Sequence, residues 1–166
     1  MKLLLGCLSL IIVSTAPLLA QTPTPQKPVR ILIANGKLAS VADAPLYFKL
    51  LQVNLTAAQS TTYLGGNAMI YPTAGALTIE IDGEPKTLQE GEGAFVSAGK
   101  SATLKGMGGR AATFFEFLLV AAADLNKAPN AKPAAVTELY QTAEPIKGLK
   151  AGPYEFTMRE VNIQRR

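Results

Sequence analysis

Glu116 is the residue whose place in the sequence most needs a chemical explanation. It interrupts an apolar strand face that it shares with Phe114, Leu118 and Val120. A carboxylate in such surroundings needs a partner if it is buried, and Arg110 is the nearest cation in the sequence. Three interpretations stay open: a structural pair of Glu116 with Arg110 or a tyrosine, a Glu116 that faces solvent, or a role in ligand binding or acid–base catalysis.

Other familiar kinds of site chemistry find little support. The chain has no histidine. This excludes a catalytic Ser–His pair and any iron, manganese, nickel or zinc site that is built on imidazole ligands. Residues Ser97–Lys100 match the S-x-x-K string, but they follow an apolar strand and contain a glycine, as a turn does. The carboxylates between Glu80 and Glu92 are typical of a solvated turn region. We therefore expect no metal and no cofactor.

The elements that must position these residues are short strands separated by turn residues, with no long helical period. Leu77–Ile81 alternates apolar and polar residues, and Asp82-Gly83 after it predicts a tight hairpin turn. Thr113–Val120 is apolar on both faces apart from Glu116, which predicts a strand covered on both sides, either central or at a subunit contact. The pattern predicts an all-β sandwich or barrel, with these candidate strands: Val29–Ile33, Leu46–Leu55, Ala68–Tyr71, Ala76–Ile81, Gly93–Val96, Ala102–Lys105, Ala112–Val120, Glu138–Gln141 and Tyr154–Ile163.

The stretch Gly75–Gly99 resembles the middle of a cupin. The second cupin segment has the spacing G-x5-P-x-G-x2-H-x3-N, and Gly91 and Gly99 fit its first two glycines. Ser97 then stands at the proline place, Ala102 at the histidine place and Gly106 at the asparagine place. The resemblance implies a double-stranded β-helix, which is a jelly-roll barrel.

The first cupin segment, H-x-H-x3–4-E-x6-G, points the same way. Gly75 fits its last glycine, Ala68 falls at the glutamate place, and the histidine places land within Thr61–Leu64. The resemblance therefore implies a cupin-like barrel in which the metal-ligand positions are lost.

Tyr63 and Tyr71 flank this altered segment, and each could offer a hydroxyl and a ring face to a small ligand inside the barrel. The preferred hypothesis is a non-catalytic barrel that binds a small ligand through Tyr63, Tyr71, Arg110 and Glu116, or assembles through its sheet edges. The alternative is a cofactor-independent enzyme that uses Glu116 with Tyr63 or Tyr71 as acid and base. It requires Glu116 and one of these tyrosines to line one cavity.

The N-terminal 20 residues have the order of a secretory signal peptide. Lys2 supplies the positive end, an apolar run follows, and small Ala20 precedes a polar, proline-rich spacer over residues 21–28. We expect cleavage near Ala20 and an exported protein, periplasmic or secreted, with no stable membrane anchor afterwards. Cleavage would leave 15 basic and 12 acidic residues and no cysteine. The scattered Lys and Arg residues do not indicate nucleic-acid binding.

Residues 29–166 are predicted to form a single domain, but part of the sequence is repeated within it. Pro45–Leu55 aligns without gaps with Pro153–Ile163, and Pro, Phe, Val and Asn are identical at four positions. Residues 137–163 would then echo the opening strands 29–55. An unpaired strand of this length is an aggregation hazard. We therefore expect the terminal strand to pair with the first unit or, in a homodimer, with a second subunit.

Overall fold

The computed structural model describes residues 28–41, 45–130 and 134–162. The predicted signal peptide, residues 1–20, and all of the predicted spacer except Pro28 lie outside these ranges. Within the described part of the chain, no helix combines the length and hydrophobicity that crossing a bilayer requires.

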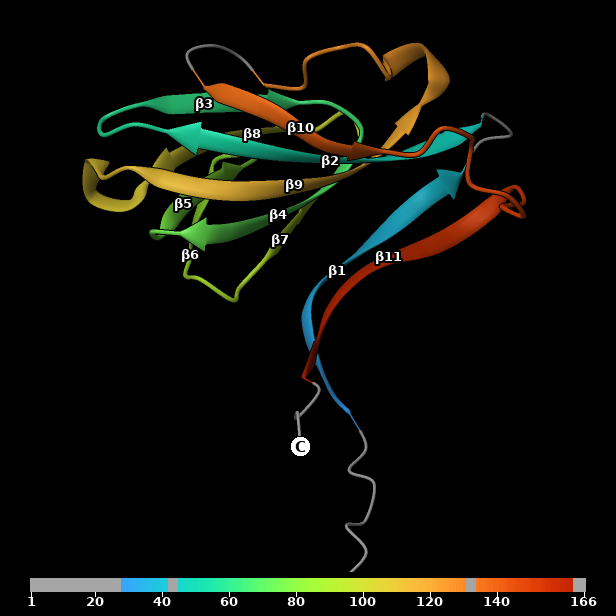
Figure 1. Cartoon of the computed structure of the whole chain (residues 1–166), viewed down its shortest axis with the longest axis horizontal. Coiled ribbons are helices and arrows are strands. Elements are labelled where there is room, and N and C mark those ends of the chain that lie inside the picture. The colour runs from blue at the N-terminus through green and yellow to red at the C-terminus, as the bar shows by residue number, and fades with distance from the viewer. Residues whose placement is uncertain (1–27, 42–44, 131–133, 163–166) are drawn as a thin grey trace, which may run out of the picture.

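Two facing antiparallel sheets form a barrel (Figure 1). The first has the order β10-β2-β9-β4-β7, and its strands are Ala135–Gln141, Leu46–Leu55, Ala112–Ala121, Asn67–Ala74 and Ala94–Val96. The second has the order β3-β8-β5-β6, and its strands are Ser60–Leu64, Ser101–Gly106, Leu77–Ile81 and Glu84–Leu88. A separate ribbon joins β1 (Val29–Val41) to β11 (Gly152–Asn162).

The strand pairing identifies the architecture. The chain makes four nested antiparallel pairs, β2 with β9, β3 with β8, β4 with β7 and β5 with β6. Such nesting describes one long hairpin, closed at β5–β6, whose two arms wind together into a double-stranded β-helix. The predicted all-β jelly-roll fold, like that of cupins, is confirmed.

Period-two alternation places the core between the two sheets. On β9 the even-numbered residues are buried and the odd-numbered ones are half-buried. The side chains that fill the interior include Leu51, Val53, Ile70, Leu77, Ile79, Leu104, Phe114 and Leu118. The barrel is therefore a packed core in which every polar side chain needs a specific explanation.

The hairpin predicted at Asp82-Gly83 is present, with φ angles of 53° and 84° at these two residues. The central position predicted for Thr113–Val120 is also found, since β9 lies between β2 and β4. On the outer face of this strand Phe115 and Phe117 are half-buried, and their rings pack edge-on with centroids 6.1 Å apart. This outer face is thus only partly covered.

The ribbon of β1 and β11 crosses from the barrel into solvent (Figure 1). Its inner part packs on β7, where the rings of Phe95 and Phe156 meet edge-on at 6.4 Å between centroids. Its other end carries the exposed apolar residues Val29, Ile31, Leu32 and Val161. In the described chain the terminal strand thus pairs with β1 and not with the sheets of the barrel.

Candidate functional site

Glu116 lies inside the barrel and is fully buried. Its neighbours across β9 are Leu51 on β2 and Ile70 on β4. Its carboxylate oxygen Oε1 accepts a hydrogen bond of 2.8 Å from Nδ2 of Asn130. A solvent-facing Glu116 is therefore excluded, and its polar partner is an amide that the sequence did not single out.

Of the partners left open for Glu116 by the sequence, Arg110 is not the one found. Arg110 is exposed in the turn before β9, and six residues of extended chain span about 20 Å. The positive charge therefore lies near the start of the strand while the carboxylate lies at its middle. Arg110 contributes nothing to the barrel interior.

The environment of Glu116 favours its neutral form. Burial raises the pKa of Glu116 to about 7, and the hydrogen bond from Asn130 offsets part of this rise. Oε2 of Glu116 and Oδ1 of Asn130 are both buried without a hydrogen-bond partner. Both orphaned atoms are acceptors, so a proton on the carboxyl group supplies a donor where the charged form has none.

Tyr63 shares this interior but is already engaged. Its ring is fully buried, and its hydroxyl donates a 2.8 Å hydrogen bond to the carbonyl oxygen of Gly66. Burial and then the nearby charge of Glu116 raise the pKa of Tyr63 well above its usual range. A phenol in these surroundings stays protonated and holds the turn after β3 in place.

Tyr71 does not join this group. On β4 it alternates with the fully buried Ile70 and pairs in register with Phe115, whose side chain lies on the outer face of the sheet. The prediction that Tyr71 points into the barrel is therefore wrong. Of the four predicted ligand-binding residues, only Tyr63 and Glu116 come together.

The positions that the cupin resemblance aligns with metal ligands do not fit a metal ion. Ala68 and Ala102 are buried in the barrel and carry no ligand atom, and Tyr63 directly faces Ala102 across β3 and β8. The one carboxylate nearby, Glu116, already binds Asn130. Among the described residues no three His, Cys, Asp or Glu side chains gather as a metal site requires.

Residues 122–130 form a segment, called here the capping loop, that closes one end of the barrel. Its C-terminal end joins β3, because the amide of Leu64 donates to the carbonyl of Pro129 over 2.8 Å and Asn130 forms a β-bridge with Tyr63. Its middle is tied to β2 through Lys49. The bond from Asn130 to Glu116 is thus one of several anchors of this loop.

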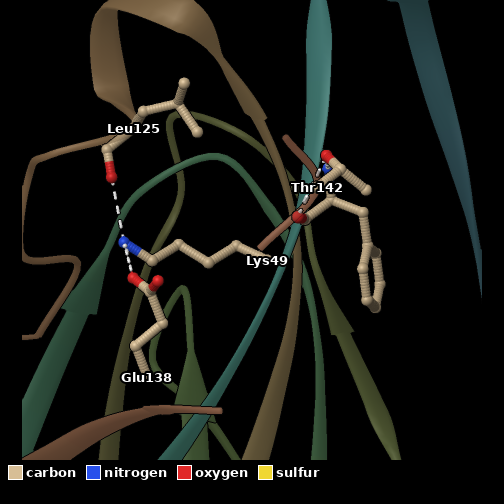
Figure 2. A network of polar contacts seen from close by, with 5 residues as sticks. Lys49, Leu125, Glu138 and Thr142 are labelled. Atoms are coloured by element: carbon tan, nitrogen blue, oxygen red, sulfur yellow. Dashed lines mark hydrogen bonds and ion pairs between the residues drawn. The ribbon is translucent and has the colours of Figure 1, made fainter. Parts of the chain in front are cut away.

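Lys49 is a second buried charge that the sequence analysis did not identify. It is only 8% exposed, and its ammonium donates to the carbonyl of Leu125 and to Glu138, each over 2.9 Å (Figure 2). Glu138 belongs to β10, so this one side chain links the capping loop, β2 and the edge strand. A charge at an inward position of β2, between Tyr47 and Leu51, was the available signal.

A cavity of about 260 Å³ lies between the capping loop and the barrel wall. Its apolar lining comes from β9, the end of β3 and the loop, and its charged lining from Lys49, Lys127 and Asp124. Lys127 and Asp124 form an ion pair of 2.7 Å at the exposed rim. The full lining is Lys49, Leu64, Gly65, Gly66, Leu118, Val120, Asp124, Lys127, Ala128 and Pro129.

No protein-family model matches this chain. No curated protein matches its sequence either. Among solved structures, the Clostridium difficile EutQ protein is similar at 21% identity and a TM-score of 0.38, over 45% of this chain and 58% of that one. A conserved protein of unknown function from Streptococcus pyogenes, SPY1581, is similar at 20% identity and a TM-score of 0.39, over 58% of this chain and 79% of that one. The matched part therefore spans less than two thirds of the EutQ chain.

The cavity and the Glu116 cluster are separate parts of the barrel end. Neither Glu116 nor Tyr63 is among the residues that line the cavity. Both are nevertheless next to it. The hydroxyl of Tyr63 donates to the carbonyl of the lining residue Gly66, and Asn130, the partner of Glu116, directly follows the lining residue Pro129. The cavity offers a buried ammonium beside apolar walls, and the cluster next to it supports the turn and the loop that enclose it.

Proposed function

We propose that the protein is an exported, metal-free jelly-roll barrel that binds a small, partly apolar anion in the cavity under the capping loop. The supporting observation is Lys49, a buried cation that lines a partly apolar cavity. An ammonium has three donors, and two of those of Lys49 are directed to Leu125 and Glu138. The third is free to serve a ligand.

The charge and size of the cavity support this ligand class. Both cations of the lining are already paired, Lys127 with Asp124 and Lys49 with Glu138, so the feature that serves an anion is the remaining N–H donor of the Lys49 ammonium. Leu118 and Val120 on its wall favour an apolar portion in the same ligand. Its volume of about 260 Å³ is just below that of most binding sites, which measure about 300–1,000 Å³, so the ligand must be small. A short carboxylic acid fits these requirements.

Hexanoate serves as a first probe, and hexanamide, which keeps the shape without the charge, is its control. We expect hexanoate to shift amide signals of the capping loop in NMR titrations and hexanamide to shift them far less. Lys49→Met should weaken hexanoate binding about tenfold or more, because it removes a charge-assisted hydrogen bond from a buried site. Lys147→Met, at an exposed loop lysine, is the matched control. Equal binding by wild type and Lys49→Met would refute this site.

The catalytic alternative, Glu116 with Tyr63 as acid and base, has less support. A pKa of Glu116 near 7 suits a general acid or base, but both side chains are fully buried and neither lines the cavity. The hydroxyl of Tyr63 is also engaged with Gly66. Binding without catalysis therefore remains the preferred proposal.

Export rests on the first 28 residues and has a direct test. We expect the protein made in its own host to begin at Gln21, because Ala20 is the small residue that ends the predicted signal peptide. Mass spectrometry of the intact protein would show the loss of residues 1–20. A chain that keeps Met1 to Ala20 in the cell extract, with nothing outside the cytoplasm, would contradict export.

A further inference from the structure

The ribbon of β1 and β11 repeats the pairing of β10 with β2. In the barrel, four consecutive pairs run from Ala135↔Asn54 to Glu138↔Leu51, and the register then shifts before Tyr140↔Leu50. In the ribbon, four consecutive pairs run from Val29↔Asn162 to Leu32↔Arg159, and the register then shifts before Ala34↔Met158. The extra residue lies at the same step in both.

The sequence repeat assigns the same correspondence. Pro45–Leu55 aligns with Pro153–Ile163, and in that alignment Asn54 corresponds to Asn162 and Leu50 to Met158. Shared register and shared sequence both make β11 the counterpart of β2, and the register makes β1 the counterpart of β10. The ribbon therefore has the form of the opening of a second sheet.

This correspondence indicates which edge of the ribbon lacks a partner. β10 forms the end of its sheet, but β2 has neighbours on both sides, β10 and β9. β11 pairs with β1 alone among the described strands. Its other edge presents unpaired backbone groups next to apolar side chains such as Val161, which is 48% exposed.

We propose that two copies of this chain pair antiparallel through their β11 edges, about a two-fold axis at Thr157. The ribbons then form one continuous sheet in the order β1-β11-β11-β1. A two-fold interface brings the same surface of each copy together, and an antiparallel strand pair centred on one residue has this symmetry. Because no ligand contributes to the interface, the dimer does not depend on the proposed function of the cavity.

Charge complementarity selects this register. With the axis at Thr157, Glu155 of one protomer faces Arg159 of its partner, and the symmetry repeats this pair. Phe156 then faces Met158, so an apolar pair lies on the other face. Moving the axis by one residue, to Met158, would place Glu155 opposite Val161 and lose both ion pairs. Arg159 makes no ion pair with another described residue, so its charge is available.

Charge reversal tests the interface in the full chain. Wild type should sediment as a dimer at micromolar concentration. Glu155→Arg or Arg159→Glu alone should raise the dimer dissociation constant about tenfold or more, since each creates two like-charged pairs. The double variant restores both pairs with reversed signs and should regain dimerisation. Lys49→Met should remain dimeric, which separates this proposal from that of ligand binding.

A cysteine at the axis tests the register. Directly opposed residues of an antiparallel pair have Cα atoms about 4.5–5.5 Å apart, within the range of a disulfide. In a Cys7→Ser background, Thr157→Cys should therefore form a covalent dimer under mild oxidation. Thr103→Cys, on the inner strand β8 with neighbours on both sides, should not. A folded monomeric wild type, or a dimer unaffected by both single reversals, would overturn the proposal.

Discussion

Glu116→Gln is expected to stabilise the protein above neutral pH and to change its stability little near pH 5. Burial raises the pKa of Glu116 to about 7 from an ordinary value of 4.5. Between pH 4.5 and about pH 7, the folded chain therefore keeps a proton on Glu116 that the unfolded chain has released. The stability that Glu116 contributes is fully present below pH 4.5, falls as the pH rises, and is lost above about pH 7.

The size of this effect follows from the difference between the pKa values of Glu116 in the folded and the unfolded chain. One pKa unit corresponds to about 1.4 kcal/mol, so the free energy of unfolding should fall by about 3 kcal/mol across it. Glutamine has no charge to bury, and its amide can donate to Oδ1 of Asn130, which has no partner in the folded protein. The variant should therefore gain up to about 3 kcal/mol over wild type at pH 8.

Urea unfolding at pH 5 and pH 8 measures this difference. Glu80→Gln, at an exposed carboxylate on β5, is the matched control and should keep the pH dependence of wild type, because Glu116 is still present. A Glu116→Gln variant less stable than wild type at pH 8 would mean that the charged carboxylate is the form that the barrel requires. The result therefore also decides which protonation state of Glu116 supports Asn130 and the capping loop.

Glu116 illustrates how much of the site the sequence could predict. Its position on an apolar strand face was enough to predict a need for a partner, because burial of an unpaired carboxylate is costly in any fold. The identity of the partner was not predictable in the same way. Asn130 reaches Glu116 only because the capping loop folds back over the barrel end and joins β3, and local pattern carries no information about that path.

Lys49 could have been found by the rule that drew attention to Glu116. It stands on the inward face of β2 with Leu51 and Val53, as Glu116 stands on that of β9. Lys49 lies outside the segments that resemble cupins, so that resemblance does not point to it. Tyr71 was misplaced for a related reason, since the face of a strand depends on a register that the sequence does not display.

The fold was predictable where burial produces a clear alternation. Among the inner strands, β5 carries that alternation and β9 a nearly continuous apolar run, and both were predicted. The two strands that were missed, β3 and β6, form the edges of the four-stranded sheet. Edge strands have more polar sequences, and in β6 only Leu88 is buried. Their pairing is set by their neighbours more than by their own residues.

The first strand was predicted too short. The prediction ended it at Ile33, before the turn-prone pair Asn35-Gly36, but β1 continues to Val41. Gly36 has no positive φ, so it is not there for a turn. A Cβ at this position would overlap three ring atoms of Phe95. The glycine is needed because the ribbon crosses directly over that ring, a contact between distant parts of the sequence.

Gly36→Ala is therefore expected to loosen the ribbon from the barrel and to lower the free energy of unfolding by about 2–3 kcal/mol, as overpacking of a close contact does. The ring of Phe95 cannot move freely, because it packs edge-on against Phe156 of β11. Lys37→Ala, at the exposed next residue, is the control and should be nearly neutral. Urea unfolding and proteolysis of the ribbon measure the two effects.

A second substitution distinguishes a steric clash from a general weakening of β1. In a Phe95→Ala background the space above Gly36 is open, so adding Gly36→Ala should cost little there, and the two changes should be strongly non-additive. Additive losses would show that Gly36 acts through the backbone of β1 alone. If the clash is the cause, Gly36→Ala should also weaken the proposed dimer, because β11 can present its edge in the required direction only while the ribbon stays docked on β7.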